Sequence, residues 1–297
     1  PGLVLCGIAG GLLHLFNHAL FKCLLFYAAG AIYRATHSID LERLGGLWKR
    51  MPKTGALFLI GALAISALPP LNGFVSELIL YAGLLSGAAP SATANVALVC
   101  GAALLAFVGA VSALSMTRAF GVAFLGSPRD PTIHAGSDAP TAMLVPMVLH
   151  AAGVLVIGVF PGVGLALGRS VTTLFLPGAT TPETEATLMA ILVPMQWACR
   201  ALAVGLVVAC AVGWRRGRKA RRDVTWGCGY TAPNARMQYT ASSFSEQFVR
   251  VFDVFLPQKR NEPAPRIRAR LALIALERAF GNKIKTGFGS GSGLSAK

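Results

Sequence analysis

Five long runs of apolar residues constrain this chain more than any other feature. They cover about residues 3–33, 54–88, 95–125, 141–166 and 187–214. A helix that crosses a membrane needs about 20 apolar residues, and backbone groups inside lipid must pair within their own segment. Only 13% of the 297 residues are charged, against about 25% in soluble domains. The sequence therefore predicts an all-α, polytopic membrane helix bundle of about five spans, and excludes an ordinary soluble enzyme.

The charged residues are unevenly distributed along the chain. Residues 215–297 hold 17 of the 27 basic and 5 of the 12 acidic residues. Basic loops favour the cytoplasmic side of a membrane, and with loop 34–53 and the tail on that side the five spans alternate without conflict. We therefore expect a membrane domain over residues 1–214 and a basic cytoplasmic tail over residues 215–297. Because these positive charges flank a span, they do not indicate nucleic-acid binding.

Two segments outside the spans have an amphipathic pattern. Loop 34–53 carries apolar residues among charged neighbours, and we expect it to lie on the cytoplasmic surface; these residues are Ile39, Leu41, Leu44, Leu47 and Trp48. The run RIRARLALIALERAF (266–280) predicts a surface helix in the tail. A start at Pro1 and a Gly/Ser-rich end at 288–297 indicate a C-terminal fragment, truncated at one or both ends.

The first run contains a row of ionisable residues. Within HLFNHALFK (14–22), His14, His18 and Lys22 are spaced four apart, so they share one face of a helix over about 12 Å. A lysine near the centre of a span costs roughly 2.5–3.5 kcal/mol and should face a wet or paired interior. Since histidine titrates near neutrality, the row predicts a proton relay. The alternative is that Lys22 snorkels or forms a fixed ion pair.

The second run is too long for one straight span and contains a helix-breaking motif. In SALPPLNGF (66–74), Pro69 and Pro70 cannot continue a helix and Gly73 adds backbone freedom. Irregular backbone at membrane depth is tolerated where it lines a cavity or is buried in protein, and transporters place ion sites at such breaks. We therefore expect a broken helix over residues 54–88.

Polar residues follow this break directly. Glu77 lies in the first turn of the second half-helix, where the helix dipole favours an anion. Asn72 and Ser76 are its expected polar partners, and Arg118, late in the third run, is either a supporting residue or an anchor at the end of its helix. The sequence thus predicts that Glu77 belongs to the relay, or else pairs locally at a structural kink.

The cysteines do not indicate a metal or redox site. Five of the six lie in apolar runs and no two have a CxxC spacing, so buried free thiols are the simpler interpretation. We also find no haem, flavin or dinucleotide signature. We therefore expect no catalytic residue, metal or cofactor in this chain.

Three motifs carry a family resemblance. HLFNHALFKCLLFYAAG (14–30), GGLWKRMP (45–52) and SALPPLNGFVSE (66–77) resemble the antiporter-like membrane subunits of NADH:quinone oxidoreductase, Mrp antiporters and membrane-bound hydrogenases. The tail WGCGYTAPNARMQYTASSF (226–244) looks most like that of the large membrane subunits of hydrogenase-4 and formate hydrogenlyase. The resemblance covers roughly residues 3–255 and implies the second half of such a subunit.

The resemblance implies roles for the ionisable residues. Lys22 would be the central lysine that accepts a proton, and His14 and His18 would connect it to the channel. Glu77 would be the terminal group, at a position where many members carry lysine. The glutamate–lysine pair of the family's first half is not in this sequence. A charge change in a neighbouring subunit would then shift the protonation of Lys22.

The resemblance also implies partners and a location. We expect a proton-translocating subunit of a redox-driven complex in the cell inner membrane. It would associate with other membrane subunits and with a soluble hydrogenase or dehydrogenase arm that holds iron–sulfur clusters and a nickel–iron centre in the hydrogenase case. The alternatives are a cation/proton antiporter subunit without redox chemistry, and a truncated remnant with only a structural role.

Overall fold

The structure is a computed structural model that forms two compact units, residues 1–245 and 246–297. The described residues are 2–86, 91–133, 136–175, 182–217 and 237–252. The predicted surface helix at 266–280 and most of the tail motif at 226–244 lie outside them. Every described helix except the last part of α8 belongs to the first unit.

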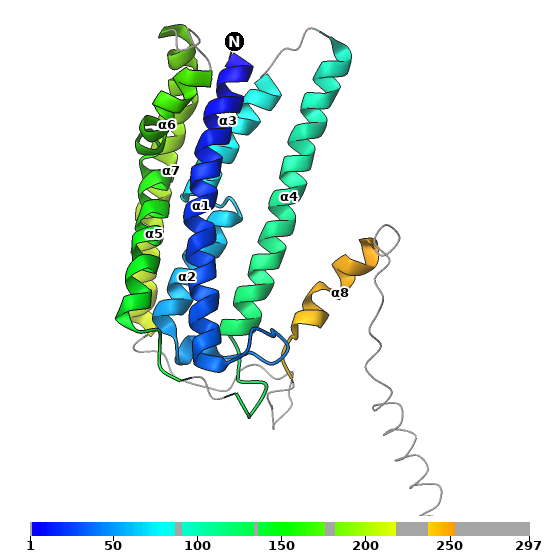
Figure 1. The fold of residues 1–297 in the computed structure, drawn as a ribbon, viewed down its shortest axis with the longest axis vertical. Helices are drawn as coiled ribbons and strands as arrows, with labels where there is room; N and C mark the ends of the chain where they lie inside the picture. Colours follow the sequence, from blue (N-terminus) through cyan, green and yellow to red (C-terminus); the bar gives the residue numbers. More distant parts are fainter. Residues whose placement is uncertain (1, 87–90, 134–135, 176–181, 218–236, 253–297) are drawn as a thin grey trace, which may run out of the picture. The chain divides into compact units, whose positions relative to one another are not determined.

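All regular structure in the described residues is helical. The elements are α1 (Gly2–Thr36), η1 (Leu47–Lys49), α2 (Pro52–Ile65), α3 (Asn72–Ser86), α4 (Ala92–Phe124), α5 (Thr141–Val159), α6 (Pro161–Phe175), α7 (Pro182–Gly217) and α8 (Ala241–Phe252). Four of these helices, α1, α4, α5 and α7, are long and apolar enough to cross a membrane, and α2 and α3 are shorter apolar helices. These helices confirm the predicted polytopic helical membrane bundle (Figure 1).

The second apolar run is broken where the sequence predicts. Helix α2 ends at Ile65, six irregular residues follow, and α3 begins at Asn72. The two half-helices lie one above the other beside α1, so together they cover the length of one span (Figure 1). The break therefore lies inside the bundle, level with the middle of α1.

The fourth apolar run differs from its prediction. The sequence suggests one span over residues 141–166, but α5 ends at Val159 and a separate helix, α6, begins at Pro161. Proline has no N–H to donate, and it is favoured in the first turn of a new helix. Hydropathy does not reveal this division into two helices, because α6 is also apolar on one side.

The loops that carry the charges gather at one end of the bundle (Figure 1). This loop end consists of residues 37–51, 125–133, 136–140 and 237–245. Within the predicted surface segment 34–53, residues 37–51 are irregular apart from η1, and the two ends belong to α1 and α2. A continuous surface helix does not form, because the backbone turns at Gly46, which has a positive φ of 67°. Leu44 and Leu47 are buried in the core and do not face a membrane surface.

Two apolar clusters hold the bundle together. One joins α1, α2, α4 and α5 through buried side chains that include Leu24, Phe58, Phe124 and Met147. The other packs Leu13 of α1 against Val75 and Ile79 of α3. Because α1 contributes to both clusters, it is the central helix, and its polar residues are held at fixed positions against the break.

Candidate functional site

The break between α2 and α3 has a defined local geometry. Ser66 closes the last turn of α2, since its N–H and its hydroxyl both donate to the carbonyl of Ala62, at 3.2 Å and 2.7 Å. The next residue, Ala67, has a positive φ of 50°, which turns the chain out of the helix. The peptide bond between Pro69 and Pro70 is cis. The predicted helix-breaking residues therefore stand at the observed break.

Two glycines allow other segments to approach the break closely. A Cβ atom added to Gly73 would collide with the carbonyl oxygen of Ala64, at the end of α2. One added to Gly158 of α5 would collide with the carbonyl oxygen of Pro70. Only glycine fits at these contacts, so the start of α3 packs directly on the end of α2, and helix α5 packs directly on the irregular backbone.

Polar side chains of α1 bind the first turn of α3. The Nδ1 atom of His14 lies 3.1 Å from the hydroxyl of Ser76. The Nδ2 atom of Asn17 donates to the carbonyl of Asn72 at 2.8 Å and to the same hydroxyl at 3.1 Å. Asn17, Asn72 and Ser76 are fully buried. We call these four residues the break cluster; it places a histidine of the predicted relay beside the residue that precedes Glu77.

The predicted row on α1 is present as one helical face. Helix α1 is continuous through His14, His18 and Lys22. The two imidazole rings have centroids 6.4 Å apart, and the His18 ring meets Phe21 edge-on at 5.4 Å. Lys22 is half-buried, and it has no hydrogen bond or ion pair with any other described residue. The proton transfers themselves remain a prediction.

Glu77 is the sixth residue of α3, beyond the first turn that the sequence predicts for it, and its carboxylate lies near α4. Its Oε2 atom would lie 3.8 Å from a Cβ atom placed on Gly109. The carboxylate is half-buried and makes no hydrogen bond or ion pair within the described part of the chain. The structure therefore brings His14 to the Ser76 side of α3, and places Glu77 on a neighbouring face, without a direct contact between Glu77 and Lys22.

Arg118 lies apart from these residues. Its guanidinium donates to the hydroxyl of Ser245 at 2.7 Å. This contact fastens the C-terminal part of α4 to the start of α8, so it favours the anchor interpretation of Arg118 over a role beside Glu77.

A second polar cluster, unpredicted from the sequence, holds the loop end together. Arg129 donates to the carbonyl oxygens of Leu44, Val122 and Tyr239, the last two at 2.9 Å and 2.6 Å. Burial lowers the pKa of this guanidinium, and the nearby carboxylate of Glu42 opposes that shift. One arginine thus joins three segments that are far apart in the sequence.

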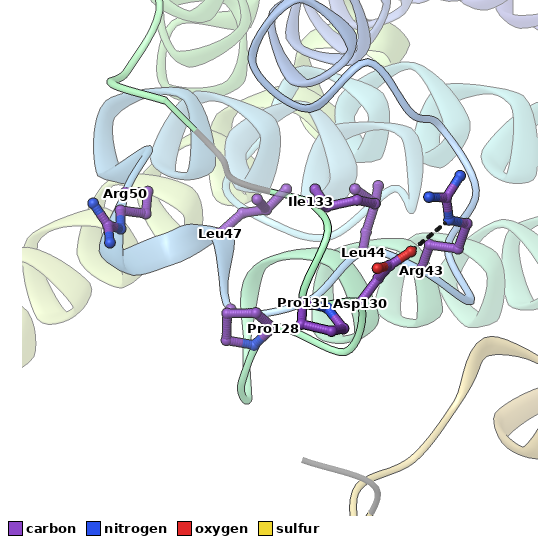
Figure 2. A pocket seen from close by; sticks show the side chains of 10 residues that line it. Arg43, Leu44, Leu47, Arg50, Pro128, Asp130, Pro131 and Ile133 are labelled. Carbon is purple, nitrogen blue, oxygen red and sulfur yellow. Dashed lines mark hydrogen bonds and ion pairs between the residues drawn. The ribbon is translucent and has the colours of Figure 1, made fainter.

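The loop end also contains a recess of about 340 Å³ (Figure 2). Arg43, Arg50 and Asp130 are the charged residues that line it, and Arg43 forms a 2.8 Å ion pair with Asp130. The side chain and N–H of Thr132, together with Arg43, lower the pKa of Asp130 to about 2. The recess contains none of the predicted relay residues, and its ion pair fixes the loops.

Sequence reasoning missed Asn17 as a member of the site. Its signal was present, because a fully polar amide in the middle of an apolar span needs buried partners. Its partners, Asn72 and Ser76, are more than 50 positions away, so only the fold identifies them. The part of the chain that the structure describes has no group of three or more His, Cys, Asp or Glu residues arranged to hold a metal ion.

Comparisons with known proteins identify relatives of this chain. Residues 2–108 match the family described as NADH:quinone oxidoreductase/Mrp antiporter, TM. The chain is 35% identical over 257 residues to hydrogenase-4 component B of Escherichia coli, covering 79% of this chain and 36% of that protein. It is 34% identical over 249 residues to formate hydrogenlyase subunit 3 of the same organism, covering 82% and 39%.

A solved structure shares the fold. A chain of the membrane-bound sulfane sulfur reductase, an archaeal respiratory membrane complex, superposes with a TM-score of 0.60 at 22% identity, over 92% of this chain and 44% of that one. The chain thus spans between 36% and 39% of the length of the two Escherichia coli relatives. The predicted family is confirmed, and the match over residues 2–108 includes the motifs at 14–30, 45–52 and 66–77.

Proposed function

We propose that this chain, which belongs to the family of antiporter-like membrane subunits, translocates protons as part of a redox-driven complex of the hydrogenase-4 or formate hydrogenlyase type. One observation carries the proposal. A histidine of the central helix is hydrogen-bonded at 3.1 Å to Ser76, the fifth residue of the helix that follows the break. Ionisable side chains within spans and broken helices are both features of ion pathways.

The proposed path runs along α1 and then leaves it at the break. Lys22 accepts a proton near the centre of the helix, and His18 and His14 carry it toward α3. Glu77, one residue beyond the hydrogen-bond partner of His14, receives it and releases it on the α4 side. The His14 and His18 rings have centroids 6.4 Å apart, and Lys22 has no hydrogen bond to another described residue. The transfer from Lys22 to His18 and the transfer from His18 to His14 therefore require mobile side chains or water.

The partners follow from the relatives. Both Escherichia coli relatives are named as parts of larger assemblies, and the solved neighbour is a chain of a respiratory membrane complex. We propose that this chain likewise contacts other membrane subunits in the cell inner membrane, with its basic tail in the cytoplasm. A soluble arm with iron–sulfur clusters, and a nickel–iron centre in the hydrogenase case, would supply the electrons.

Cation/proton exchange without redox chemistry is the second candidate. It is favoured by the family match itself, because the matched description includes Mrp antiporters. The two candidates differ in their partners rather than in this chain, since both use the same break and the same ionisable row.

The deciding experiment begins with the native complex in mild detergent. Mass spectrometry identifies the chains that co-purify, and proteoliposomes with a pH-sensitive dye then report proton movement on addition of an electron donor. A hydrogenase-like soluble subunit and donor-dependent acidification support the proposal. Antiporter subunits alone, with proton movement driven by a sodium gradient, support the second candidate. A complex that moves no protons by either route refutes both.

A further inference from the structure

Arg200 is a cation near the middle of a membrane-spanning helix. The apolar part of α7 covers Leu188–Gly217, and with a rise of about 1.5 Å per residue Arg200 lies about 18 Å from the first residue of this part. The hydrocarbon core of a bilayer is about 30 Å thick, so Arg200 lies well inside it. Snorkelling to the headgroups serves residues near helix ends, whereas a charge at this depth pairs with another group or faces water.

The described residues hold the Arg200 guanidinium but leave its charge unneutralised. Its central carbon lies 4.8 Å from the ring centre of Phe160 and 5.0 Å from that of Trp197. In the amide orientation that satisfies both groups, the oxygen of Gln196 accepts from Nη1 at 3.0 Å and from Nη2. These three partners carry no charge. No described carboxylate forms an ion pair with Arg200, and its buried Nε has no partner among the described residues.

Arg200 borders a stripe of α7 that the bundle leaves uncovered. The inner side of α7 packs in the cluster that contains residues of α1 and α3, through Leu192, Met195 and Cys199. The outer side exposes large apolar side chains, which are Val193, Trp197, Val204 and Val208. Arg200 follows Trp197 by three positions and precedes Val204 by four, so it shares this outer side. Alternation of three and four is also the spacing of the seam between two packed helices.

We infer that this outer stripe of α7 docks a membrane helix of a partner subunit that carries a carboxylate opposite Arg200. Lipid tails can cover the valines of the stripe but cannot neutralise the arginine. A guanidinium binds a carboxylate through two parallel hydrogen bonds, and each Nη atom keeps one hydrogen that is not directed to Gln196. The rings of Phe160 and Trp197 hold the planar group in place for this pairing. The inference rests on the proposed function for the presence of a partner subunit in the membrane.

Photo-crosslinking in native membranes tests the occupant of the stripe without changing Arg200. A benzophenone amino acid replaces Val204, the membranes are irradiated, and mass spectrometry identifies the captured chain. We expect a membrane segment of a partner subunit, with an Asp or Glu within one helical turn of the captured residue. Capture of no protein would mean that lipid covers the stripe. That result, capture of another segment of the same polypeptide, or capture of a partner segment without such a carboxylate overturns the inference.

A charge swap tests the ion pair itself. Arg200→Glu would place two carboxylates opposite each other, and like charges across an interface weaken binding strongly. The amount of the captured partner that co-purifies in mild detergent should fall at least about tenfold. Arginine at the partner's carboxylate position, combined with Arg200→Glu, should restore it. Arg216→Glu, the same charge reversal at the exposed end of α7, is the matched control and should retain the partner.

The swap also separates this inference from the proposed function. If Arg200→Glu retains the partner in full, or if the reciprocal swap does not restore a lost partner, the ion pair does not exist. Neither the capture nor the co-purification depends on transport. A complex that shows both expected results but moves no protons refutes the proposed function and leaves the docking of α7 intact. A complex that pumps while Arg200→Glu retains its partner refutes the docking alone.

Discussion

The break cluster and the loop end are both polar, yet they differ in how completely their groups are paired. At the loop end, Arg129 donates to carbonyls from three segments, and Arg43 is paired with Asp130. There the Nε atom of Arg129 is buried without a partner among the described residues. In the break cluster, Oδ1 of Asn17 and both polar side-chain atoms of Asn72 have no partner among the described residues, although they are buried.

This difference separates a structural role from a functional one. Buried polar groups are normally hydrogen-bonded, and incomplete pairing needs a specific explanation. A cluster in which an arginine binds several carbonyls and a second arginine is ion-paired fixes loops, and a change of protonation there is unfavourable. A partly paired cluster beside an ionisable row can exchange its partners at low cost, which a proton path requires. The comparison predicts that substitutions at the break change transport, and that those at the loop end change stability.

Lys22→Ala should have the largest effect. Loss of the central proton acceptor should lower the rate of proton translocation by roughly 100-fold or more, while the complex still assembles, because no described residue depends on Lys22 for a hydrogen bond. The measurement is acidification of proteoliposomes together with native gel electrophoresis. Lys49→Ala, an exposed lysine on η1, is the control. A Lys22→Ala complex that pumps normally removes Lys22 from the relay.

Gly73→Ala tests the geometry of the break rather than its charges. The added Cβ atom would collide with the carbonyl of Ala64, and overpacking of this kind costs about 2 kcal/mol. The free energy of unfolding, measured by denaturant titration of the detergent-solubilised complex, should fall accordingly. Gly11→Ala is the control, since a Cβ atom there meets nothing within 4 Å. Equal stability of the two variants would mean that α3 does not approach α2 this closely.

Glu77→Gln should reduce proton transport because the amide cannot take up a proton at neutral pH, but by less than Lys22→Ala, because the amide keeps the shape of the side chain. The assay is the same proteoliposome measurement. Glu42→Gln at the loop end serves as control, because Glu42 accepts from Ser242 and lies apart from the break cluster. Full activity of Glu77→Gln would restrict Glu77 to a structural role at the kink.

The sequence contained enough to predict the spans, the break and the ionisable face, because each is a local pattern of hydropathy or spacing. Hydropathy did not predict that the fourth run divides at Phe160 and Pro161, because the apolar sequence continues on both sides of the proline. Nor did it indicate that Arg118 reaches Ser245, or that Asn17 reaches Asn72 and Ser76. These contacts join residues 55 to 127 positions apart, so they depend on how the helices pack.

Substitution of Asp138 should have the smallest effect of these changes, and it tests the stability of the loop end directly. It caps α2 from a distant segment, accepting from the N–H of Lys53 at 2.7 Å and from the hydroxyl of Thr54 at 2.5 Å. Loss of such a cap costs about 1 kcal/mol. Asp138→Ala should therefore lower the free energy of unfolding by that amount, with little change in transport, whereas Asp138→Asn retains an acceptor and should lose less.

The pH dependence of this effect has a definite sign. Burial by itself raises the pKa of Asp138, but the hydrogen bonds from Thr54, Ala139 and Lys53 outweigh it, so the pKa lies below its ordinary value of 3.8. The native state thus favours the carboxylate form of Asp138. The contribution of this carboxylate to the free energy of unfolding is fully present above the ordinary pKa, and it disappears as the pH falls through the lowered pKa of the native state. The stability difference between the native chain and Asp138→Ala should be constant at neutral pH and shrink below about pH 4. If it grew on acidification, the carboxylate would not be the capping group, and the loop end would be held by Arg129 and the Arg43–Asp130 pair without it.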